Sequence, residues 1–367
     1  MGVRPKSPDY VIFFSIIGLM GFGIVMVYSS SAVSAYVNYN DSYYFLKRQM
    51  IWATLGILTM LLTMNIDYHA WRKLAKPVMI ITLILLVLVL VPGLGKVVNG
   101  ARRWLGFGSL YLQPSEIAKL SMVLFTVHSL AKSQDKIGHF VKGVVPQLAM
   151  LLVVFGLILK EPDLGTGLVI SGTVFILLFA SGVKLSHLGS LGAAGVIGII
   201  AAIIAEPYRL KRLLAFSDPW ADPLNSGYHI IQSLYAIGSG GLFGVGLGRS
   251  REKFLYLPEP HTDFIFAILG EELGFIGTAT VIILFFLFAW RGFKIAISAP
   301  DVYGSLLAGG IASMIVLQAL MNIAVVTASM PVTGIPLPFI SFGGSSLIFT
   351  LAAVGILLNV SRYVSLK

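Results

Sequence analysis

Residues 75–92 read AKPVMIITLILLVLVLVP, an almost unbroken apolar run that follows the basic residues Arg72 and Lys73. Such a run approaches the roughly 20 apolar residues that an α-helix needs to cross about 30 Å of hydrocarbon. Comparable blocks recur along the whole chain. They predict an all-α polytopic membrane protein with about ten transmembrane helices, at roughly 10–30, 49–66, 75–92, 115–132, 143–160, 164–182, 187–205, 264–290, 303–327 and 343–361.

The composition agrees with this prediction. Of the 367 residues, 57% are hydrophobic and 11% are charged, and the mean hydropathy is +0.89. Soluble domains carry roughly 25% charged residues, so this chain has too little charge to cover a water-exposed surface. The net charge of +10 indicates contacts with anionic membrane lipids rather than nucleic acid. The absence of cysteine excludes disulfides and thiolate metal sites.

Lysine and arginine in short loops predict the orientation of the chain. With both termini in the cytoplasm, the inner segments hold most of these residues: Arg4, Lys6, Arg72, Lys73, Lys76, Lys132, Lys136, Lys142, Lys184, Arg291, Lys294, Arg362 and Lys367. The short outer loops hold only Lys47, Arg48 and Lys160. An even number of spans follows. We expect a single transmembrane domain, 1–367, with one large outer loop, 206–263, between spans seven and eight.

Other basic residues lie outside, against this bias. Lys96, Arg102 and Arg103 are in the outer loop 93–114, and the large loop holds Arg209, Lys211, Arg212, Arg249, Arg251 and Lys253. They could contact lipid head groups, or they could form an outer site for a phosphate-bearing anionic substrate. Charge alone does not decide between these interpretations.

The large outer loop carries two recognisable patterns. Apolar residues between Leu224 and Gly238 recur at near-helical spacing, which predicts a short amphipathic helix on the bilayer surface. The glycine-rich stretch from Gly240 to Gly248 predicts a flexible apolar segment. No nucleotide-binding glycine motif is present, so we do not expect ATP to be used.

Asp263 is a candidate general base. It follows the sequence Glu259-Pro260-His261-Thr262, where the large outer loop meets the eighth span. A carboxylate at the mouth of a membrane cavity is partly desolvated, which raises its pKa and suits it to accept a proton. The alternative is structural, because Thr262 or Asp263 could cap the first free N–H groups of the span.

Four further groups have both a functional and a structural interpretation. Glu116 and Lys119 share a helical face, as a cavity-facing pair or as a structural ion pair. Asp163 could cap span six, and the small residues around Ser345 could pack helices or meet a diphosphate. Glu271 and Glu272 could form a proton or ion pathway, or face neighbouring helices. The scattered histidines show no metal-ligand spacing, so no protein-built metal site is expected.

Eight segments, in this order along the chain, resemble the SEDS family (shape, elongation, division and sporulation), the FtsW/RodA/SpoVE group of bacterial cell-wall polymerases. The segments are YYFLKRQ (43–49), NGARRW (99–104), QPSE (113–116) with Lys119, EPDLGT (161–166), PYR (207–209), GYHIIQ (227–232), TDFIF (262–266) and PVTGIPLPFISFGGSS (331–346). Within the family the chain is most similar to the sporulation member SpoVE, through PYRLKR (207–212), YLPEP (256–260) and VSRY (360–363). One departure is Glu161, where a glutamine is common in the family.

The resemblance implies polymerisation of lipid II into β-1,4 glycan strands at the outer face of the bacterial cytoplasmic membrane, for division, shape or spore-wall synthesis. It gives Asp263 the role of base, with Glu116 orienting Lys119. It makes Arg48, Lys119, Arg209 and Arg212 candidates for diphosphate contacts, and adds Asp163, Trp104 and Ser345 as further candidates. A class B penicillin-binding protein is the implied cross-linking partner. No tightly bound cofactor is implied, although Mg²⁺ or Mn²⁺ could assist the diphosphate.

Two other functions fit the same sequence. A lipid II flippase would use the intramembrane charges, but it should offer diphosphate contacts on both faces, with Arg72, Lys73 and Lys76 on the inner one. A scaffold that only recruits the transpeptidase would do no chemistry, and it predicts that Asp263→Asn leaves function intact. The concentration of motifs on the outer side favours the polymerase.

Overall fold

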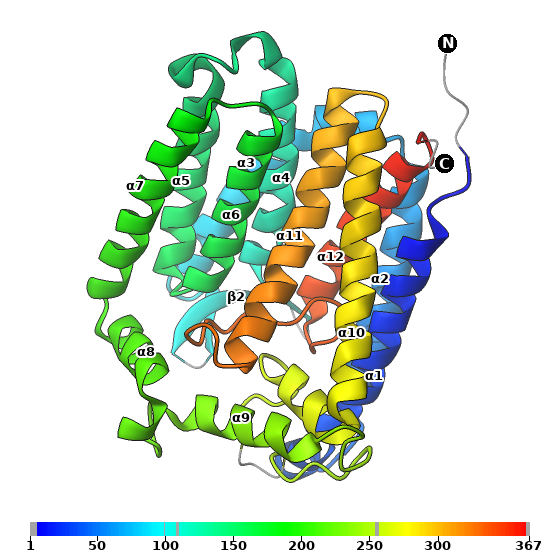
Figure 1. Cartoon of the computed structure of the whole chain (residues 1–367), viewed down its shortest axis with the longest axis vertical. Helices are drawn as coiled ribbons and strands as arrows, with labels where there is room; N and C mark the ends of the chain where they lie inside the picture. Colours follow the sequence, from blue (N-terminus) through cyan, green and yellow to red (C-terminus); the bar gives the residue numbers. More distant parts are fainter. Residues whose placement is uncertain (1–5, 99, 108–109, 254–256, 365–367) are drawn as a thin grey trace.

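The computed structural model describes residues 6–98, 100–107, 110–253 and 257–364. Within them, ten helices form a bundle of roughly parallel rods (Figure 1). They are α1 (Tyr10–Tyr39), α2 (Tyr44–Asn65), α3 (Tyr68–Leu90), α4 (Pro114–Lys132), α5 (Val145–Lys160), α6 (Leu164–Ala180), α7 (Leu185–Ile204), α10 (Ile265–Ser298), α11 (Val302–Val326) and α12 (Gly344–Ser361). The predicted all-α membrane fold is confirmed.

Eight helices of the described residues are long and apolar enough to cross a membrane. They are α1, α2, α3, α7, α10, α11, α12 and the segment Phe140–Lys160, in which a π-turn leads into α5. The apolar helix α6 is shorter, at 17 residues, and α4 carries Glu116 and Lys119 in its first two turns. Both pack inside the bundle, against α11 and each other. Ten spans therefore remains a prediction.

Two helices extend well beyond the predicted spans. The first span was expected to end near residue 30, but α1 continues to Tyr39. The eighth was expected over 264–290, but α10 continues to Ser298 and is broken at Gly274, where φ is 64° and ψ is −161°. Hydropathy marks the part of a helix that lies in hydrocarbon, and helices can project into water on either side of it.

Both termini lie at the same end of the bundle (Figure 1). There, the Lys6 N–H donates to the Arg362 carbonyl at 2.8 Å. Asp9 caps α1 through the Ile12 N–H and pairs with Arg291 of α10 at 3.0 Å. The loops that carry most of the family-like segments lie at the opposite end.

The loop 93–114 contains a small sheet that was not predicted. Strand β1 (Gly95–Val98) pairs antiparallel with β2 (Ala101–Phe107), which pairs antiparallel with β3 (Leu110–Leu112). The sheet packs against α3 and α4. It brings Arg103 and Trp104 of β2 to the end of the bundle opposite the termini.

The large loop 206–263 contains α8 (Pro207–Ser217), a 3₁₀ turn (Pro219–Ala221) and α9 (Tyr228–Gly240). Figure 1 shows α9 running across the end of the bundle, crosswise to the long helices. This is the amphipathic helix predicted over 224–238, starting four residues later. The glycine-rich segment that follows is not a free loop, because Val245 and Gly246 donate to the carbonyls of Glu271 and Glu272 in α10.

Candidate active site

Two adjoining cavities open at the end of the bundle opposite the termini. The first, the central cavity, has a volume of about 600 Å³ and is lined by Arg103, Glu116, Asp163, Lys211, Arg212 and Asp263, among others. The second, the side cavity, has a volume of about 680 Å³ and is lined by Arg48, Trp52, Lys96, Tyr111 and His261, among others. Both are bordered by Trp104, Glu259, Thr262, Phe342 and Gly343, so a single wall separates them.

Asp263 presents an uncommitted carboxylate to the central cavity. Its backbone carbonyl accepts from the Asn322 amide at 2.8 Å, which fixes the main chain. The side chain makes no hydrogen bond to any residue within the described ranges. Helix α10 begins at Ile265, and its N-cap residue is Phe264. No side chain of the described residues accepts a hydrogen bond from the free N–H groups at this end, so the capping interpretation of Thr262 and Asp263 is wrong. A half-buried carboxylate with no structural partner is available for chemistry.

The surroundings raise the pKa of the Asp263 carboxyl group. Burial in the cavity raises its pKa from 3.8 to about 7, and the negative charges of Glu259 and Asp163 act in the same direction. The positive charges of Arg103 and Arg212 oppose this shift. A carboxylate with a pKa near neutrality is well matched to accept a proton at physiological pH.

Among the residues that the structure describes, three cations line the central cavity, and they come from two elements. Lys211 and Arg212 come from α8, and the Arg212 guanidinium donates to the Val332 carbonyl at 3.3 Å. Arg103 comes from β2 and donates through Nε and Nη2 to the carbonyls of Glu161 and Pro162, at 2.9 and 2.5 Å. An arginine has five N–H donors, so each of these guanidinium groups retains donors for an anion. The sequence analysis included Arg103 and Lys211 among the basic residues of a possible anionic-substrate site, but it did not choose them as specific diphosphate ligands.

Arg209, a predicted diphosphate ligand, lies elsewhere. Its guanidinium is buried, donating to the Ala202 carbonyl at 2.8 Å and the Tyr208 hydroxyl at 2.9 Å. It borders a separate apolar groove of about 230 Å³ rather than the central cavity. Its contacts tie α8 to the end of α7, so its geometry supports a structural role.

The Glu116–Lys119 pair joins α4 to α11. The two charged groups are 2.7 Å apart, and both side chains are almost fully buried. Lys119 also donates to Gln318 of α11 at 2.6 Å, and Gln318 donates to the Pro336 carbonyl at 2.9 Å. Glu116 reaches the central cavity, whereas Lys119 is not among its lining residues. The pair therefore supports the cavity wall, with the lysine behind the glutamate.

The remaining predicted site residues are Asp163, Ser345 and Trp104, which lie at or near the walls of the two cavities. Asp163 caps α6, accepting from the Thr166 N–H at 3.0 Å and the Thr166 hydroxyl at 2.9 Å, and it lines the central cavity. The Ser345 hydroxyl accepts from the Gln113 N–H at 3.3 Å, which joins α12 to the start of α4. Trp104 borders both cavities.

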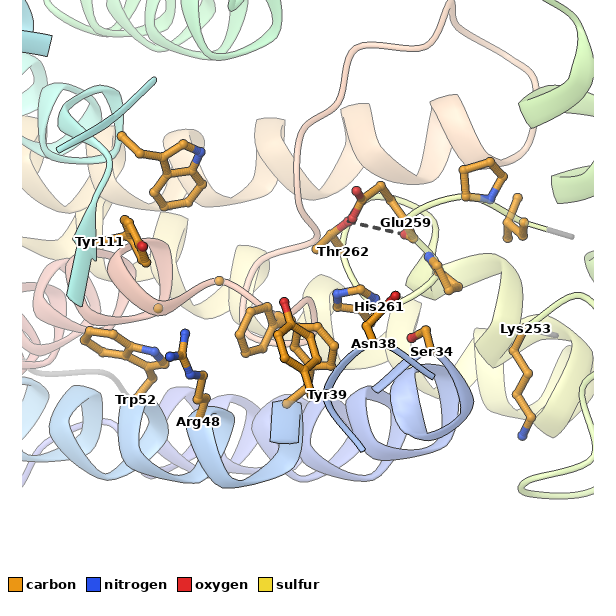
Figure 2. A pocket seen from close by; sticks show the side chains of 18 of the residues that line it. Ser34, Asn38, Tyr39, Arg48, Trp52, Tyr111, Lys253, Glu259, His261 and Thr262 are labelled. Carbon is orange, nitrogen blue, oxygen red and sulfur yellow. Dashed lines mark hydrogen bonds between the residues drawn. The ribbon is translucent and has the colours of Figure 1, made fainter. Parts of the chain in front are cut away.

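Arg48 lies in the side cavity, away from the other predicted diphosphate ligands. Figure 2 shows it beside Trp52, with Tyr111 across the cavity. Its guanidinium stacks over the ring of Tyr44, 4.7 Å from the centroid. Glu259 and Thr262, which hydrogen-bond to each other at 3.2 Å, form the opposite wall. The side cavity thus combines cations with aromatic rings.

Glu161 is a buried acid next to the site. Its side chain is inaccessible to solvent, and neither carboxylate oxygen has a hydrogen-bond partner among the residues described. Burial raises its pKa from 4.5 to about 9, and the charge of Asp163 adds to that effect, while Arg103 opposes it. Glu161 is therefore neutral at pH 7, which lets it replace an uncharged glutamine.

The donor set does not fit a preformed metal site. Within the described ranges, no group of three or more histidine, aspartate and glutamate side chains is close enough to hold an ion. Asp163 is committed to capping α6 and Glu116 to Lys119.

The chain is similar over nearly its whole length to curated bacterial proteins. Stage V sporulation protein E of Bacillus subtilis is 51% identical over 363 residues, which cover 99% of each chain. A probable peptidoglycan glycosyltransferase FtsW of Trichlorobacter lovleyi is 46% identical over 358 residues, 98% of this chain and 94% of that protein.

Solved structures share the fold. The rod shape determining protein RodA of Thermus thermophilus has a TM-score of 0.71 at 31% identity, covering 98% of both chains. A chain of a peptidoglycan synthase complex that coordinates polymerisation and crosslinking has a TM-score of 0.78 at 33% identity, over 97% of this chain and 98% of that one. The family model of the FtsW, RodA and SpoVE cell cycle proteins matches residues 10–366. The chain therefore belongs to the FtsW/RodA/SpoVE family of cell cycle proteins.

Proposed function

We propose that this multi-pass membrane protein is a peptidoglycan glycosyltransferase that polymerises lipid II into β-1,4 glycan strands, with Asp263 as the general base. The observation that carries the proposal is the free carboxylate of Asp263 in a cavity that also holds Arg103, Lys211 and Arg212. The cavity opens at the end opposite both termini. With the termini in the cytoplasm, that end faces the outside of the cell, where glycan strands are made.

The base removes a proton as the new bond forms. The 4-hydroxyl of the terminal N-acetylglucosamine of one lipid II donates its proton to the Asp263 carboxylate, and its oxygen attacks the anomeric carbon of the growing strand. The bond from that carbon to the diphosphate breaks, and its electron pair leaves with undecaprenyl diphosphate. Attack from the face opposite the leaving group converts the α-diphosphate to a β-glycoside. Asp263 then returns the proton to water.

The cations of the central cavity stabilise the departing group. Negative charge builds up on the bridging oxygen of the diphosphate as the glycosidic bond breaks, and fixed positive charges lower the energy of that state. Arg103 and Arg212 are held by backbone carbonyls, so their guanidinium groups are oriented before substrate binds. Any Mg²⁺ or Mn²⁺ that assists would enter with the diphosphate.

A cross-linking enzyme must act on the product. We infer that the chain works with a class B penicillin-binding protein, because one of its structural neighbours belongs to a complex that couples polymerisation to crosslinking. The resemblance to a sporulation protein supports spore-wall synthesis as the setting, and the similarity to FtsW proteins supports division as the second candidate.

The decisive experiment measures glycan strands made from purified lipid II, with and without a matched class B partner. Asp263→Ala is compared with wild type and with Asp222→Asn, a control in the same loop whose carboxylate bonds only to Asn225 and Ser226 in the described structure. We expect strands from wild type and the control, and none from folded Asp263→Ala. Equal strands from all three would refute Asp263 as the base. No strands from any of them would refute the polymerase, and lipid II flipping in liposomes would then be measured.

A further inference from the structure

The helix that follows Asp263 is broken close to its start. The break at Gly274 divides α10 into a short outer part, 265–273, and a long inner part. A single helix of nine residues has little stability of its own in isolation, so its position must be set by contacts with other segments. The outer part begins two residues after Asp263, and its position therefore determines where the base lies.

The backbone of residues 241–246 fills the break. The carbonyls of Gly241 and Leu242 accept from Phe275 and Ile276, at 2.9 and 3.2 Å. In return, Val245 and Gly246 donate to the carbonyls of Glu271 and Glu272, at 2.9 and 3.1 Å. These four hydrogen bonds satisfy backbone N–H and carbonyl groups that would be paired within the helix if α10 were unbroken.

The close approach requires glycine on both sides of the break. A Cβ atom on Gly244 would lie 2.1 Å from the Glu272 carbonyl oxygen, and one on Gly274 would lie 2.3 Å from the Gly244 nitrogen. Both residues also have positive φ, 79° and 64°, which a side chain would oppose. The glycine-rich sequence thus encodes a specific backbone contact.

Two buried glutamates then attach the next part of the loop. Glu272, which is fully buried, accepts from Lys253 at 2.9 Å, from the Ser29 hydroxyl of α1 at 2.6 Å and from the Ser250 N–H at 3.3 Å. Glu271 accepts from the Arg251 N–H at 2.7 Å and the Ser250 hydroxyl at 2.5 Å. Buried carboxylates are costly unless paired, so losing one partner should disturb the whole cluster.

The cluster lies at the base of the segment that carries Asp263. Lys253 binds Glu272 in the outer part of α10, and residues 257–264 lead directly into Ile265, the first residue of that part. Within that segment, Glu259 and Thr262 wall both cavities. Figure 2 shows Lys253 at the edge of the side cavity, distant from Arg48 and with its ammonium directed away from the cavity.

We infer that Lys253, Glu272 and Ser29 are positioning residues for the transferase reaction: their buried cluster holds the chain at Lys253 against α1 and the outer part of α10, and so sets the place of residues 257–264, which carry Asp263. Only the predicted effect of this cluster on the polymerisation rate rests on the proposed function. The clamp, meaning the hold of this cluster on residues 257–264, concerns the order of the loop, which can be measured without any substrate.

The test compares Lys253→Met with Arg291→Met. The Arg291–Asp9 pair is a matched control, because it also joins α1 to α10, through the buried N-cap residue Asp9 and the partly buried Arg291, 3.0 Å apart, but at the opposite end of both helices. Hydrogen exchange in purified protein is followed in peptides covering 257–264 and, as reference, α11. We expect Lys253→Met to speed exchange in 257–264 and leave α11 unchanged, whereas Arg291→Met leaves 257–264 protected.

The kinetic arm uses lipid II polymerisation. Displacing a base by about 1 Å can cost on the order of a hundredfold in rate, so Lys253→Met should lower kcat tenfold or more with KM within about twofold. The acid limb of its pH profile should shift to lower pH, as Asp263 becomes more hydrated. Lys253→Arg should recover most of the rate, and Ser29→Ala should show a smaller loss in the same direction.

Either arm can overturn the inference. If 257–264 exchanges equally in wild type, Lys253→Met and Ser29→Ala, no clamp exists. If Arg291→Met lowers kcat as much as Lys253→Met does, the effect is a general loss of stability. If wild type itself makes no strands, the proposed function fails, while the exchange measurement still decides whether the clamp is real.

Discussion

Polymerisation should depend on the ionisation of Asp263, whose pKa is about 7 instead of the ordinary 3.8. Only the carboxylate form accepts the proton of the attacking hydroxyl. With a pKa of about 7, about half of the molecules carry that form at pH 7, about a tenth at pH 6 and about nine tenths at pH 8. The initial rate at limiting lipid II should therefore fall about tenfold from pH 8 to pH 6.

The Glu259→Gln variant tests the cause of that shift. After burial, the charge of Glu259 is the largest influence raising the pKa of Asp263. Glutamine keeps an oxygen that can accept from the Thr262 hydroxyl, as Glu259 does at 3.2 Å, but it removes the charge. The pKa of Asp263 should therefore fall, and the acid limb of kcat/KM should move to lower pH, with the rate at pH 6 rising relative to that at pH 8.

The matched control is Glu206→Gln, an exposed glutamate at the start of α8 that is not among the charges acting on Asp263. Its profile should coincide with that of wild type. A wild-type rate that is flat from about pH 6 to 8 would refute Asp263 as a base of raised pKa. An acid limb that Glu259→Gln leaves in place would refute the electrostatic explanation.

Three further predictions concern residues around the site. Glu161→Gln should stabilise the fold. The pKa of Glu161 is about 9 in the folded protein against 4.5 ordinarily, so the glutamate lowers the free energy of unfolding by about 3 kcal/mol at pH 7. In thermal unfolding, the gain in melting temperature of the variant should vanish below pH 4.5 and grow as the pH rises to 9. Gly344→Ala should lower the free energy of unfolding by about 1–3 kcal/mol, because the added Cβ would lie 2.4 Å from the Trp52 ring. The control Gly343→Ala should not change the melting temperature, because the atom nearest to its Cβ would be 3.4 Å away. Arg209→Met should lower the melting temperature and leave KM for lipid II unchanged. Arg212→Met should lower the polymerisation rate about tenfold or more without lowering the melting temperature. The reverse pattern would show that Arg209, and not Arg212, contacts the substrate.

The helices could be predicted from sequence because the solvent dictates them. A segment in hydrocarbon must be apolar and must satisfy its own backbone, so hydropathy alone locates most of the bundle. The 95–112 sheet could not be found this way, since its strands are short and contain basic residues outside the membrane. The Asn99-Gly100 dipeptide, a common hairpin turn, was the available signal.

The site was predictable in position but not in detail. Asp263 stands out because carboxylates are scarce and it lies where a long outer loop meets a span. Arg209 and Arg212, however, are separated by one helical turn and look equivalent in sequence. Only tertiary contacts distinguish them: Arg209 meets the carbonyl end of α7, while Arg212 reaches the central cavity. The close backbone contact between Gly244 and Gly274 could not be predicted either, because hydropathy does not report contacts between two backbone segments.

In the proposed reaction, the central cavity has to meet two requirements that conflict. A base needs a raised pKa, which nearby cations lower, yet the leaving diphosphate needs those same cations. The protein meets both by giving its arginines other partners: Arg103 binds the carbonyls of Glu161 and Pro162, and Arg212 binds that of Val332. Neither forms an ion pair with Asp263 within the described residues. A bound diphosphate would offset the positive charge further, so the carboxylate becomes a stronger base when the substrate is in place.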